Sequence, residues 1–422
     1  MNDTANDAHS SVSTLFAHLD AAVSPVHSVT HAAGRLSDSG FTEVDVLSSA
    51  LPTRGYLVRG GLLIAWFRGS RPSFRVVGAH TDSPTLRLKP SPDLRRFGWS
   101  QWSVEVYGGI LNNSWLDRDL GIAGVVVDRD GRRHSIRSPH PVARIPQLAV
   151  HLDRDVNDKG LILHRQNHLV PVVGSSDDLS SFADVVADWA GLDPASIVAH
   201  ELSLYDTQPA TLIGVRRDLV ASGRIDNQVS CWAAIEALLA VDGGDDDGRP
   251  TGVVALFDHE EVGSSSTVGA AGPWLEWVLE ALHTGDRSSL HASLAASACL
   301  SADCAHGLHP NYAERHDPEH RPHLGGGPVL KINANQRYAT SVDTEALFVR
   351  TCDRAGVRHQ TFVSRNDMPC GSTIGPLAST RLGIPTADIG VAQLSMHSVR
   401  ETCHRDDPED LRRVLTSFFW AE

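Results

Sequence analysis

Five short segments of the sequence place acidic or imidazole side chains directly after an apolar run. The segments are GAHTDSP, SGRIDNQVS, ALFDHEEVGS, CLSADCAHGLHPN and LSMHSVRE, and their polar residues include His80, Asp82, Asp226, Glu260, Glu261, Asp303, His306, His309 and His397. Histidine nitrogens and carboxylate oxygens are ligands of catalytic zinc, and a pair of zinc ions also needs a carboxylate that bridges them. Two histidines and three carboxylates as ligands, with one further carboxylate that is not needed as a ligand, suit a two-metal hydrolase.

Each segment alone has an ordinary structural explanation. His80 could end a strand with a hydrogen bond to Asp82, and Glu260 and Glu261 could form a solvated acidic turn. The spacing does not match the helical HExxH zinc motif, so no local metal signature is present. The joint occurrence of five such clusters, each next to an apolar run, favours a metal site over chance surface composition.

The composition restricts the partners that the protein can have. The 422 residues include 37 Lys and Arg against 51 Asp and Glu, a formal net charge of −14. We therefore expect no nucleic-acid partner and no binding to anionic membranes. No uncharged apolar run reaches the ~18 residues of a membrane span, and no secretory signal is visible. The six cysteines are irregularly spaced in the C-terminal half without a CxxC pair, which predicts reduced, mostly buried thiols and a cytoplasmic protein.

The hydrophobic pattern predicts the elements that position these residues. Residues 13–23 have helical spacing, and a β-branched run over 74–80 predicts a buried strand that delivers His80 at its carboxyl end. Between 89 and 214 the pattern changes to short strands punctuated by Pro and Gly. The strands expected there include 102–106, 122–127, 161–163 and 169–173.

These patterns predict an α/β protein in which a mostly β domain interrupts a sheet domain with helices on both faces. We expect the sheet domain to comprise residues 1–88 and 215–422, and the inserted domain to comprise residues 89–214. The insert is too long for a loop and too rich in β-structure for a linker. We therefore expect it to form an association surface.

Long motifs run along nearly the whole chain in a fixed order. They are GAHTDSP, GGILNNSWLDRDLGIAG, RIPQLAVHLDRDVN, SGRIDNQVSCWAAIEAL, FDHEEVGSSSTVGA, DCAHGLHPN, LKINANQRYAT, NDMPCGSTIGP and MHSVRE. In these motifs the sequence resembles the aspartyl aminopeptidase family, family eighteen of the metallopeptidases. The resemblance implies a zinc-peptidase fold and an aminopeptidase with two Zn²⁺ per subunit, for which Mn²⁺ or Co²⁺ can substitute. It also implies peptide substrates with a free N-terminus.

The resemblance assigns a role to each candidate residue. One zinc would be held by His80, Asp226 and Asp303, and the other by Asp226, Glu261 and His397, so that Asp226 is the bridge. Asp82 would orient the site, and Glu260 would be the general base. His151, in the insert, would reach the active site of a neighbouring subunit and there bind the oxyanion or contact the metal region.

The resemblance also implies a pocket for the substrate's first residue. His306, Lys331 and Tyr338 would bind an acidic side chain, and Gly371 and Ser372 would present backbone amides to the substrate. The family further implies dimers that form through the insert and assemble into a closed dodecamer. Three alternatives stay open: a preference for neutral residues, a related two-metal deacylase or carboxypeptidase, and a non-catalytic scaffold. The WLDRDL and NANQRYAT segments argue against the second, and the complete set of ligands argues against the third.

Overall fold

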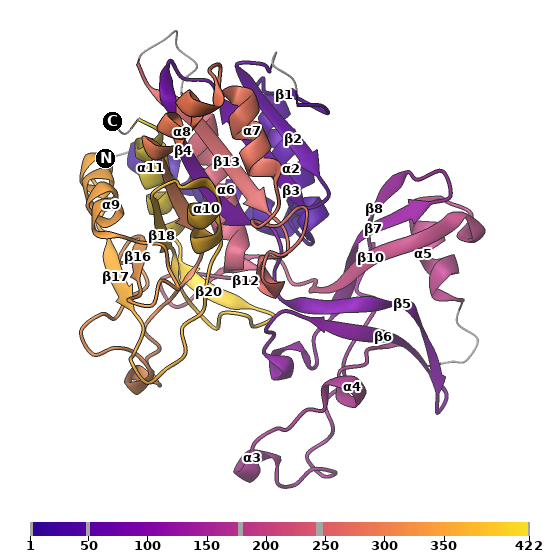
Figure 1. Ribbon diagram of the computed structural model, residues 1–422. Coiled ribbons are helices and arrows are strands. Elements are labelled where there is room, and N and C mark those ends of the chain that lie inside the picture. Colours follow the sequence, from indigo (N-terminus) through magenta and orange to yellow (C-terminus); the bar gives the residue numbers. More distant parts are fainter. Residues whose placement is uncertain (1–2, 48–50, 176–179, 242–247, 421–422) are drawn as a thin grey trace.

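The structure, a computed structural model, describes residues 3–47, 51–175, 180–241 and 248–420. Within this part of the chain, the largest sheet has nine strands in the order β1–β2–β3–β13–β4–β14–β18–β16–β17 (Figure 1). The strands are β1 (Thr42–Glu43), β2 (Arg54–Arg59), β3 (Leu62–Phe67), β4 (Arg71–His80), β13 (Pro250–Phe257), β14 (Ala298–Ala302), β16 (Val329–Ile332), β17 (Gln360–Val363) and β18 (Thr386–Gly390). The sheet is mixed, because β3 and β16 pair antiparallel with their neighbours β13 and β18.

Four neighbouring strands in the middle of this sheet, β13, β4, β14 and β18, run parallel. They are short apolar runs that are buried over nearly their whole length, as expected for strands covered on both faces. The carboxyl ends of parallel strands meet at one edge of a sheet. His80 ends β4, Asp303 follows β14, and Glu260 and Glu261 follow β13, so these residues come together at that edge.

The side chains of the central strands alternate between two cores, one on each face of the sheet. Val77 and Leu256 contribute to one core, while their neighbours Val76 and Ala255 contribute to the other. The first core includes residues of helices α1 (Asp3–Ala21), α2 (Pro25–Asp38), α6 (Ile225–Leu239), α9 (Val342–Ala355) and α11 (Asp407–Phe419). The second includes residues of α7 (Trp274–Leu282), α8 (Arg287–Ala295) and α10 (Gly375–Leu382).

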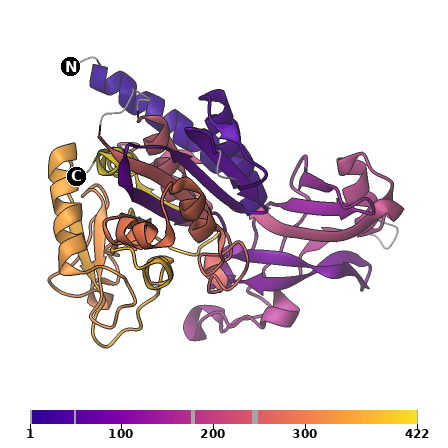
Figure 2. The same cartoon turned by 45° about the horizontal axis from the view of Figure 1, so that its top comes forward.

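A second sheet lies beside the first and is entirely antiparallel. Its order among the described residues is β8–β7–β10–β5–β6–β9, and Figures 1 and 2 both show it extending away from the larger sheet. The strands are β5 (Thr85–Arg96), β6 (Trp99–Tyr107), β7 (Leu120–Asp128), β8 (Arg133–Arg137), β9 (Val172–Gly174) and β10 (Ile197–Asp206). Leu86, Ile122 and Leu202 form its core with Phe182 of α5 (Phe182–Ala190). The protein is thus a mixed α/β fold with a large mixed sheet and a separate antiparallel sheet.

Residues 146–168, which we call the arm, connect β8 to β9 through two short helices, α3 (Val156–Lys159) and α4 (Arg165–His168). The strand expected over residues 161–163 is wrong: this segment has no strand structure, and Ile162 is 85% exposed. Its short apolar run, Leu161 to Leu163, resembles a strand, but no neighbouring strand pairs with it in the described chain. In Figure 1 the arm projects away from both sheets.

A third, smaller sheet lies beside the edge at which His80, Asp303, Glu260 and Glu261 meet. Its order in the described chain is β11–β12–β20–β19–β15. The strands are β11 (Thr211–Ile213), β12 (Leu219–Ser222), β15 (Ala305–His306), β19 (Ala392–Leu394) and β20 (Glu401–His404). The sheet therefore places His306 and the turn that carries His397 beside the larger sheet. No helix among the described residues has the length and apolar character needed to span a membrane.

Candidate metal centre

His80, at the end of β4, is 1% exposed and faces two aspartates. Its Nε2 lies 3.5 Å from Asp226 Oδ1 and 3.4 Å from Asp303 Oδ1. Its Nδ1 lies 3.0 Å from the main-chain oxygen of Asp82. A carbonyl oxygen can only accept a hydrogen bond, so Nδ1 carries a proton, and Nε2, which faces the aspartates, is the nitrogen that would bind a metal.

His397 repeats this arrangement on the other side of Asp226. Its Nε2 lies 3.5 Å from Asp226 Oδ2 and 3.4 Å from Glu261 Oε2. Its Nδ1 lies 3.1 Å from the carbonyl oxygen of Gly109, so here too Nε2, which faces the carboxylates, is the nitrogen that would bind a metal. The two oxygens of Asp226 therefore face two different histidines, as the geometry of a bridging carboxylate requires.

The distances in this cluster fit metal ligation better than direct hydrogen bonding. N···O hydrogen bonds have lengths of about 2.7–3.2 Å. Two ligands at about 2.0–2.2 Å from one tetrahedral zinc ion are about 3.3–3.6 Å apart. All four separations between the histidine Nε2 atoms and the carboxylates are 3.4 or 3.5 Å. Asp226 Oδ1 and Glu261 Oε1 are buried without a hydrogen-bond partner in the described chain, and ligand atoms of His80, Asp226 and Glu261 lie within 4.8 Å of one another.

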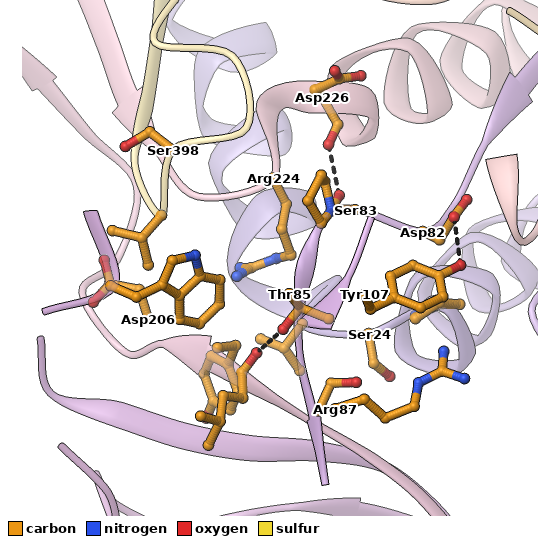
Figure 3. A pocket seen from close by; sticks show the side chains of 18 of the residues that line it. Ser24, Asp82, Ser83, Thr85, Arg87, Tyr107, Asp206, Arg224, Asp226 and Ser398 are labelled. Atoms are coloured by element: carbon orange, nitrogen blue, oxygen red, sulfur yellow. Dashed lines mark hydrogen bonds between the residues drawn. The ribbon is translucent and has the colours of Figure 1, made fainter. Parts of the chain in front are cut away.

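Glu260 and Glu261 lie together in a short turn after β13. His259 and Gly263 flank it with positive φ angles of 63° and 94°, so the backbone reverses within a few residues. The main-chain N–H groups of Glu260 and Glu261 donate to the two carboxylate oxygens of Asp82, at 3.1 and 3.0 Å. Asp82 also accepts a 2.7 Å hydrogen bond from the hydroxyl of Tyr107 (Figure 3). Asp82 thus fixes the turn that carries both glutamates.

The electrostatics of the cluster favour bound cations. Burial, together with neighbouring carboxylates that include Asp226, raises the pKa of Glu260 to about 7 and that of Glu261 well above its usual value. Burial alone would lower the pKa of His80, but its contacts with Asp226, Asp303 and Asp82 raise it. Several carboxylates buried together repel one another unless positive charge is placed between them. The donor set therefore fits zinc, which histidine and carboxylate ligands bind.

A cavity of about 400 Å³ opens onto the cluster. Its lining includes every sequence-predicted ligand and substrate residue except His151, namely His80, Asp226, Glu260, Glu261, Asp303, His306, Lys331, Tyr338, Gly371, Ser372 and His397. Lys331 is 2% exposed, and its Nζ donates to the carbonyl oxygen of Cys304 at 3.1 Å. The same Nζ lies 3.4 Å from Asp303 Oδ2 and 5.3 Å from the centre of the Tyr338 ring.

The structure separates His151 from this cavity, because His151 lies exposed in the arm and does not line it. Asp82 lies behind the ligands rather than in the cavity. Residues that were not singled out from the sequence also contact the site. Among them, Tyr107 donates to Asp82, and Glu401 accepts hydrogen bonds from Asp226 and His397. Glu401 ends the MHSVRE motif, which was its only local signal.

Comparisons with known proteins agree with this geometry. A family model described as "Aminopeptidase I zinc metalloprotease (M18)" matches residues 18–419. The chain is therefore a zinc metallopeptidase. It belongs to the M18 family of aminopeptidases, which are hydrolases, and the resemblance seen in the sequence motifs is confirmed.

Relatives of similar length support this membership. The chain is 46% identical over 416 residues to a probable M18 family aminopeptidase 2 of Streptomyces coelicolor, and the match covers 96% of each chain. It is 44% identical over 427 residues to a probable M18 family aminopeptidase 2 of Mycobacterium leprae, over 98% of this chain and 99% of the relative.

Solved structures share the fold. A chain in the cryo-EM structure of the Ape4 and Nbr1 complex superposes with a TM-score of 0.94 at 35% identity, covering 100% of this chain and 87% of that one. The S. cerevisiae mApe1 dodecamer gives 0.84 at 29% identity, over 97% and 96% of the two chains. An M18 aminopeptidase from Thermotoga maritima gives 0.87 at 23% identity, over 99% and 97%, which supports the fold alone.

Proposed function

We propose that this chain is a dinuclear zinc aminopeptidase that releases N-terminal residues, preferably Asp or Glu, from peptides. The observation that carries the proposal is the position of Asp226, whose two oxygens face His80 on one side and His397 on the other. In this account His80, Asp226 and Asp303 hold one zinc, and Asp226, Glu261 and His397 hold the other. Mn²⁺ or Co²⁺ can replace zinc, since imidazole and carboxylate also suit these ions.

When bound, the zinc ions supply Lewis acidity, which polarises the scissile carbonyl and lowers the pKa of a water molecule. Glu260 is the general base in this account: it accepts a proton from the attacking water and passes it to the leaving amine. Asp82 keeps Glu260 in place through the hydrogen bond from the Glu260 main chain. Gly371 and Ser372, which line the same cavity, offer backbone amides to the substrate main chain.

The acidic preference rests on Lys331. Burial acts to lower the pKa of Lys331, but Asp303 and Asp388 raise it, so the ammonium stays charged beside the cavity. A buried ammonium that faces a substrate pocket attracts a carboxylate there. His306 and Tyr338 line the same wall and add hydrogen-bonding groups.

The insert, residues 89–214 between catalytic segments 1–88 and 215–422, is proposed to form the dimer. The arm exposes the apolar side chains of Leu148, Val150, Leu152 and Ile162. Exposed apolar patches mark association surfaces, and burial of the arm against a second chain would carry His151 toward that chain's site. The solved mApe1 structure is a dodecamer, which supports a closed assembly built from such dimers. The six cysteines are free thiols, which fits the cytoplasm.

The proposal is tested with peptides that differ in one feature at a time. Zinc-loaded protein is given tripeptides that begin with Asp, Glu or Leu and share one tail, with N-acetylated versions as matched controls. We expect release of the first residue only from free N-termini, and faster release of Asp and Glu than of Leu. Cleavage of acetylated peptides would indicate a deacylase, release from the C-terminus a carboxypeptidase, and fastest release of Leu a neutral preference. No cleavage with both metals bound would indicate a scaffold.

A further inference from the structure

Glu401 is a buried carboxylate that is not a candidate metal ligand. It begins β20 and is 1% exposed. Its Oε2 accepts the main-chain N–H of Asp226 at 2.9 Å, and its Oε1 accepts the main-chain N–H of His397 at 2.7 Å. One side chain thus joins the backbones of two proposed ligands that lie far apart in the sequence.

Neither of these two N–H groups has a partner in regular secondary structure. Asp226 lies at the start of α6 with non-helical angles, φ −81° and ψ 106°, so its N–H lies outside the helical hydrogen-bond pattern. His397 has a φ of +67°, in the left-handed region that residues other than glycine rarely adopt. A buried N–H without a partner is costly, and Glu401 satisfies both.

Other contacts fix these two ligands at further points. The hydroxyl of Ser83 donates to the carbonyl oxygen of Asp226 at 2.6 Å, as Figure 3 shows. Asp226 is therefore held on both sides of its peptide backbone, by Glu401 and by Ser83. His397 is held at its N–H by Glu401 and at its ring by the carbonyl oxygen of Gly109.

Asp82 and Glu401 have the same arrangement in different parts of the site. The carboxylate of Asp82 accepts two N–H groups, those of Glu260 and Glu261, and the carboxylate of Glu401 accepts those of Asp226 and His397. Asp82 thereby positions the proposed base and one ligand. Glu401 holds the proposed bridge and the histidine on the side of Glu261.

We infer that Glu401 is a positioning residue that sets the spacing between Asp226 and His397. It thereby sets the affinity of the metal site formed by these two residues and Glu261. The inference rests on the proposed two-metal function. Both oxygens of Glu401 accept hydrogen bonds, so Glu401→Gln places an NH₂ group against one of the two N–H donors and breaks that contact. Loss of such a supporting contact weakens metal binding by about 10–100-fold.

Asp407→Asn provides the matched control. Asp407 is also fully buried, and its two carboxylate oxygens accept the N–H groups of Gly325 and Gly327 at 2.8 and 3.1 Å. None of these three residues lines the metal cavity. The control therefore removes the same kind of contact from the fold without touching a proposed ligand.

The experiment is a zinc titration of the metal-free protein against a competing chelator, with the melting temperature of each metal-free variant as the measure of folding. We expect wild type and Asp407→Asn to bind two zinc ions with equal affinities. In Glu401→Gln at least one affinity should fall tenfold or more, while its melting temperature falls no further than that of the control. If Glu401→Gln does not fold, Glu401→Asp, which keeps the charge but is one methylene shorter, is judged by the same tenfold threshold.

Two results would overturn the inference: unchanged zinc affinities in the Glu401 variant, or an equal loss in Asp407→Asn. The titration of wild type separates this failure from failure of the proposed function. Fewer than two zinc ions bound by wild type would contradict the two-metal site itself. Two ions bound equally well with and without Glu401 would contradict only the role of Glu401.

Discussion

The cluster of proposed metal ligands and the arm differ in how far their side chains are buried within the chain. The cluster is formed where the carboxyl edge of the large sheet meets the start of α6, which carries Asp226, and the turn before β20, which carries His397. Its ligands are buried or half-buried, and hydrogen bonds hold His80, Asp226 and His397 in place. The arm, residues 146–168, has only two short helices and leaves Leu152 75% exposed.

This difference shows which part of the proposed active site one chain can complete alone. Contacts within one chain already bring the proposed ligands together, and the parallel strands supply His80, Asp303 and Glu261 among them. Leu161 and Leu163 of the arm pack against the core of the antiparallel sheet, but other apolar side chains of the arm, such as Leu152, are exposed and favour a second protein surface. We therefore expect changes in the cluster to act within one chain and changes in the arm to act between chains.

The largest effect is expected from Glu260→Gln, within the cluster. The amide cannot accept the proton, so turnover should fall by about 10²–10⁴-fold, while both metals stay bound because Glu260 is not a proposed ligand. Turnover numbers and metal content of the purified variant check this. The same change at the exposed Glu280 of α7 is the control and should have no effect. Near-normal turnover of Glu260→Gln would remove it from the role of base.

The next effect is expected from His151→Ala, in the arm. If His151 stabilises the oxyanion in a neighbouring site, its loss should lower turnover by about 10²–10³-fold. Mixing this variant with Glu260→Gln in equal amounts should restore activity. Half of randomly formed dimers are mixed and each has one intact site, so about one quarter of wild-type activity is expected.

The exposed His164→Ala, in the same arm, serves as the control and should be fully active alone. If subunit exchange is verified and the mixture stays inactive, His151 does not act between chains. Full activity of a proven monomer would likewise show that His151 does not act between chains.

A smaller and more selective effect is expected from Lys331→Met, in the cavity wall. Removing the ammonium should reduce kcat/KM for an Asp-terminal peptide by about 2 kcal/mol, or roughly thirtyfold, more than for a Leu-terminal one. The Leu peptide is the internal control, because it records any general loss from the contact between Lys331 and Asp303. Equal losses on both peptides would assign Lys331 a structural role only.

The last effect is on stability rather than on turnover, and it concerns His18, which supports the cluster from α1. Its Nε2 lies 3.1 Å from Gln228 Oε1 in α6, and Gln228 Nε2 donates to the carbonyl oxygen of Thr81, next to His80. Burial, with a smaller effect from His31, lowers the pKa of His18 to about 3. The unfolded chain therefore binds a proton at higher pH than the folded one. The contribution of the buried, neutral His18 to the free energy of unfolding is fully present above pH ~6.5. It is lost as the pH falls from there toward about 3.

Denaturant unfolding at several pH values measures this loss. Over that range the free energy of unfolding of wild type should fall by up to about 1.4 kcal/mol per pH unit more than that of His18→Gln. The control, His164→Gln in the exposed arm, should follow wild type. Parallel curves for wild type and His18→Gln would show that His18 does not contribute.

The sequence predicted the parts of the site that depend on local pattern. The apolar run ending at His80 and the polar residues after β13 and β14 indicated strand ends, and parallel strands then require these residues to meet. Glu260 and Glu261 lie in a turn that His259 and Gly263 flank with positive φ. The roles of these residues remain predictions that the experiments above test.

Contacts between distant segments could not be predicted in this way. Tyr107 reaches Asp82 from another strand, and Glu401 reaches Asp226 across most of the second half of the chain. Nothing in the local sequence around either residue indicates its partner. The strand expected over 161–163 was wrong for a related reason: a short apolar run forms a strand only where a neighbouring strand pairs with it.

The central claim is that Asp226 bridges two metal ions, and the zinc content of wild type and Asp226→Ala tests it most directly. Protein loaded with zinc and freed of unbound ions is analysed for zinc per chain, with circular dichroism to show that the variant is folded. The account predicts two zinc ions per wild-type chain, and fewer than one in Asp226→Ala, because one substitution removes a ligand from both ions. One zinc ion per fully active wild-type chain, or two in folded Asp226→Ala, would contradict it.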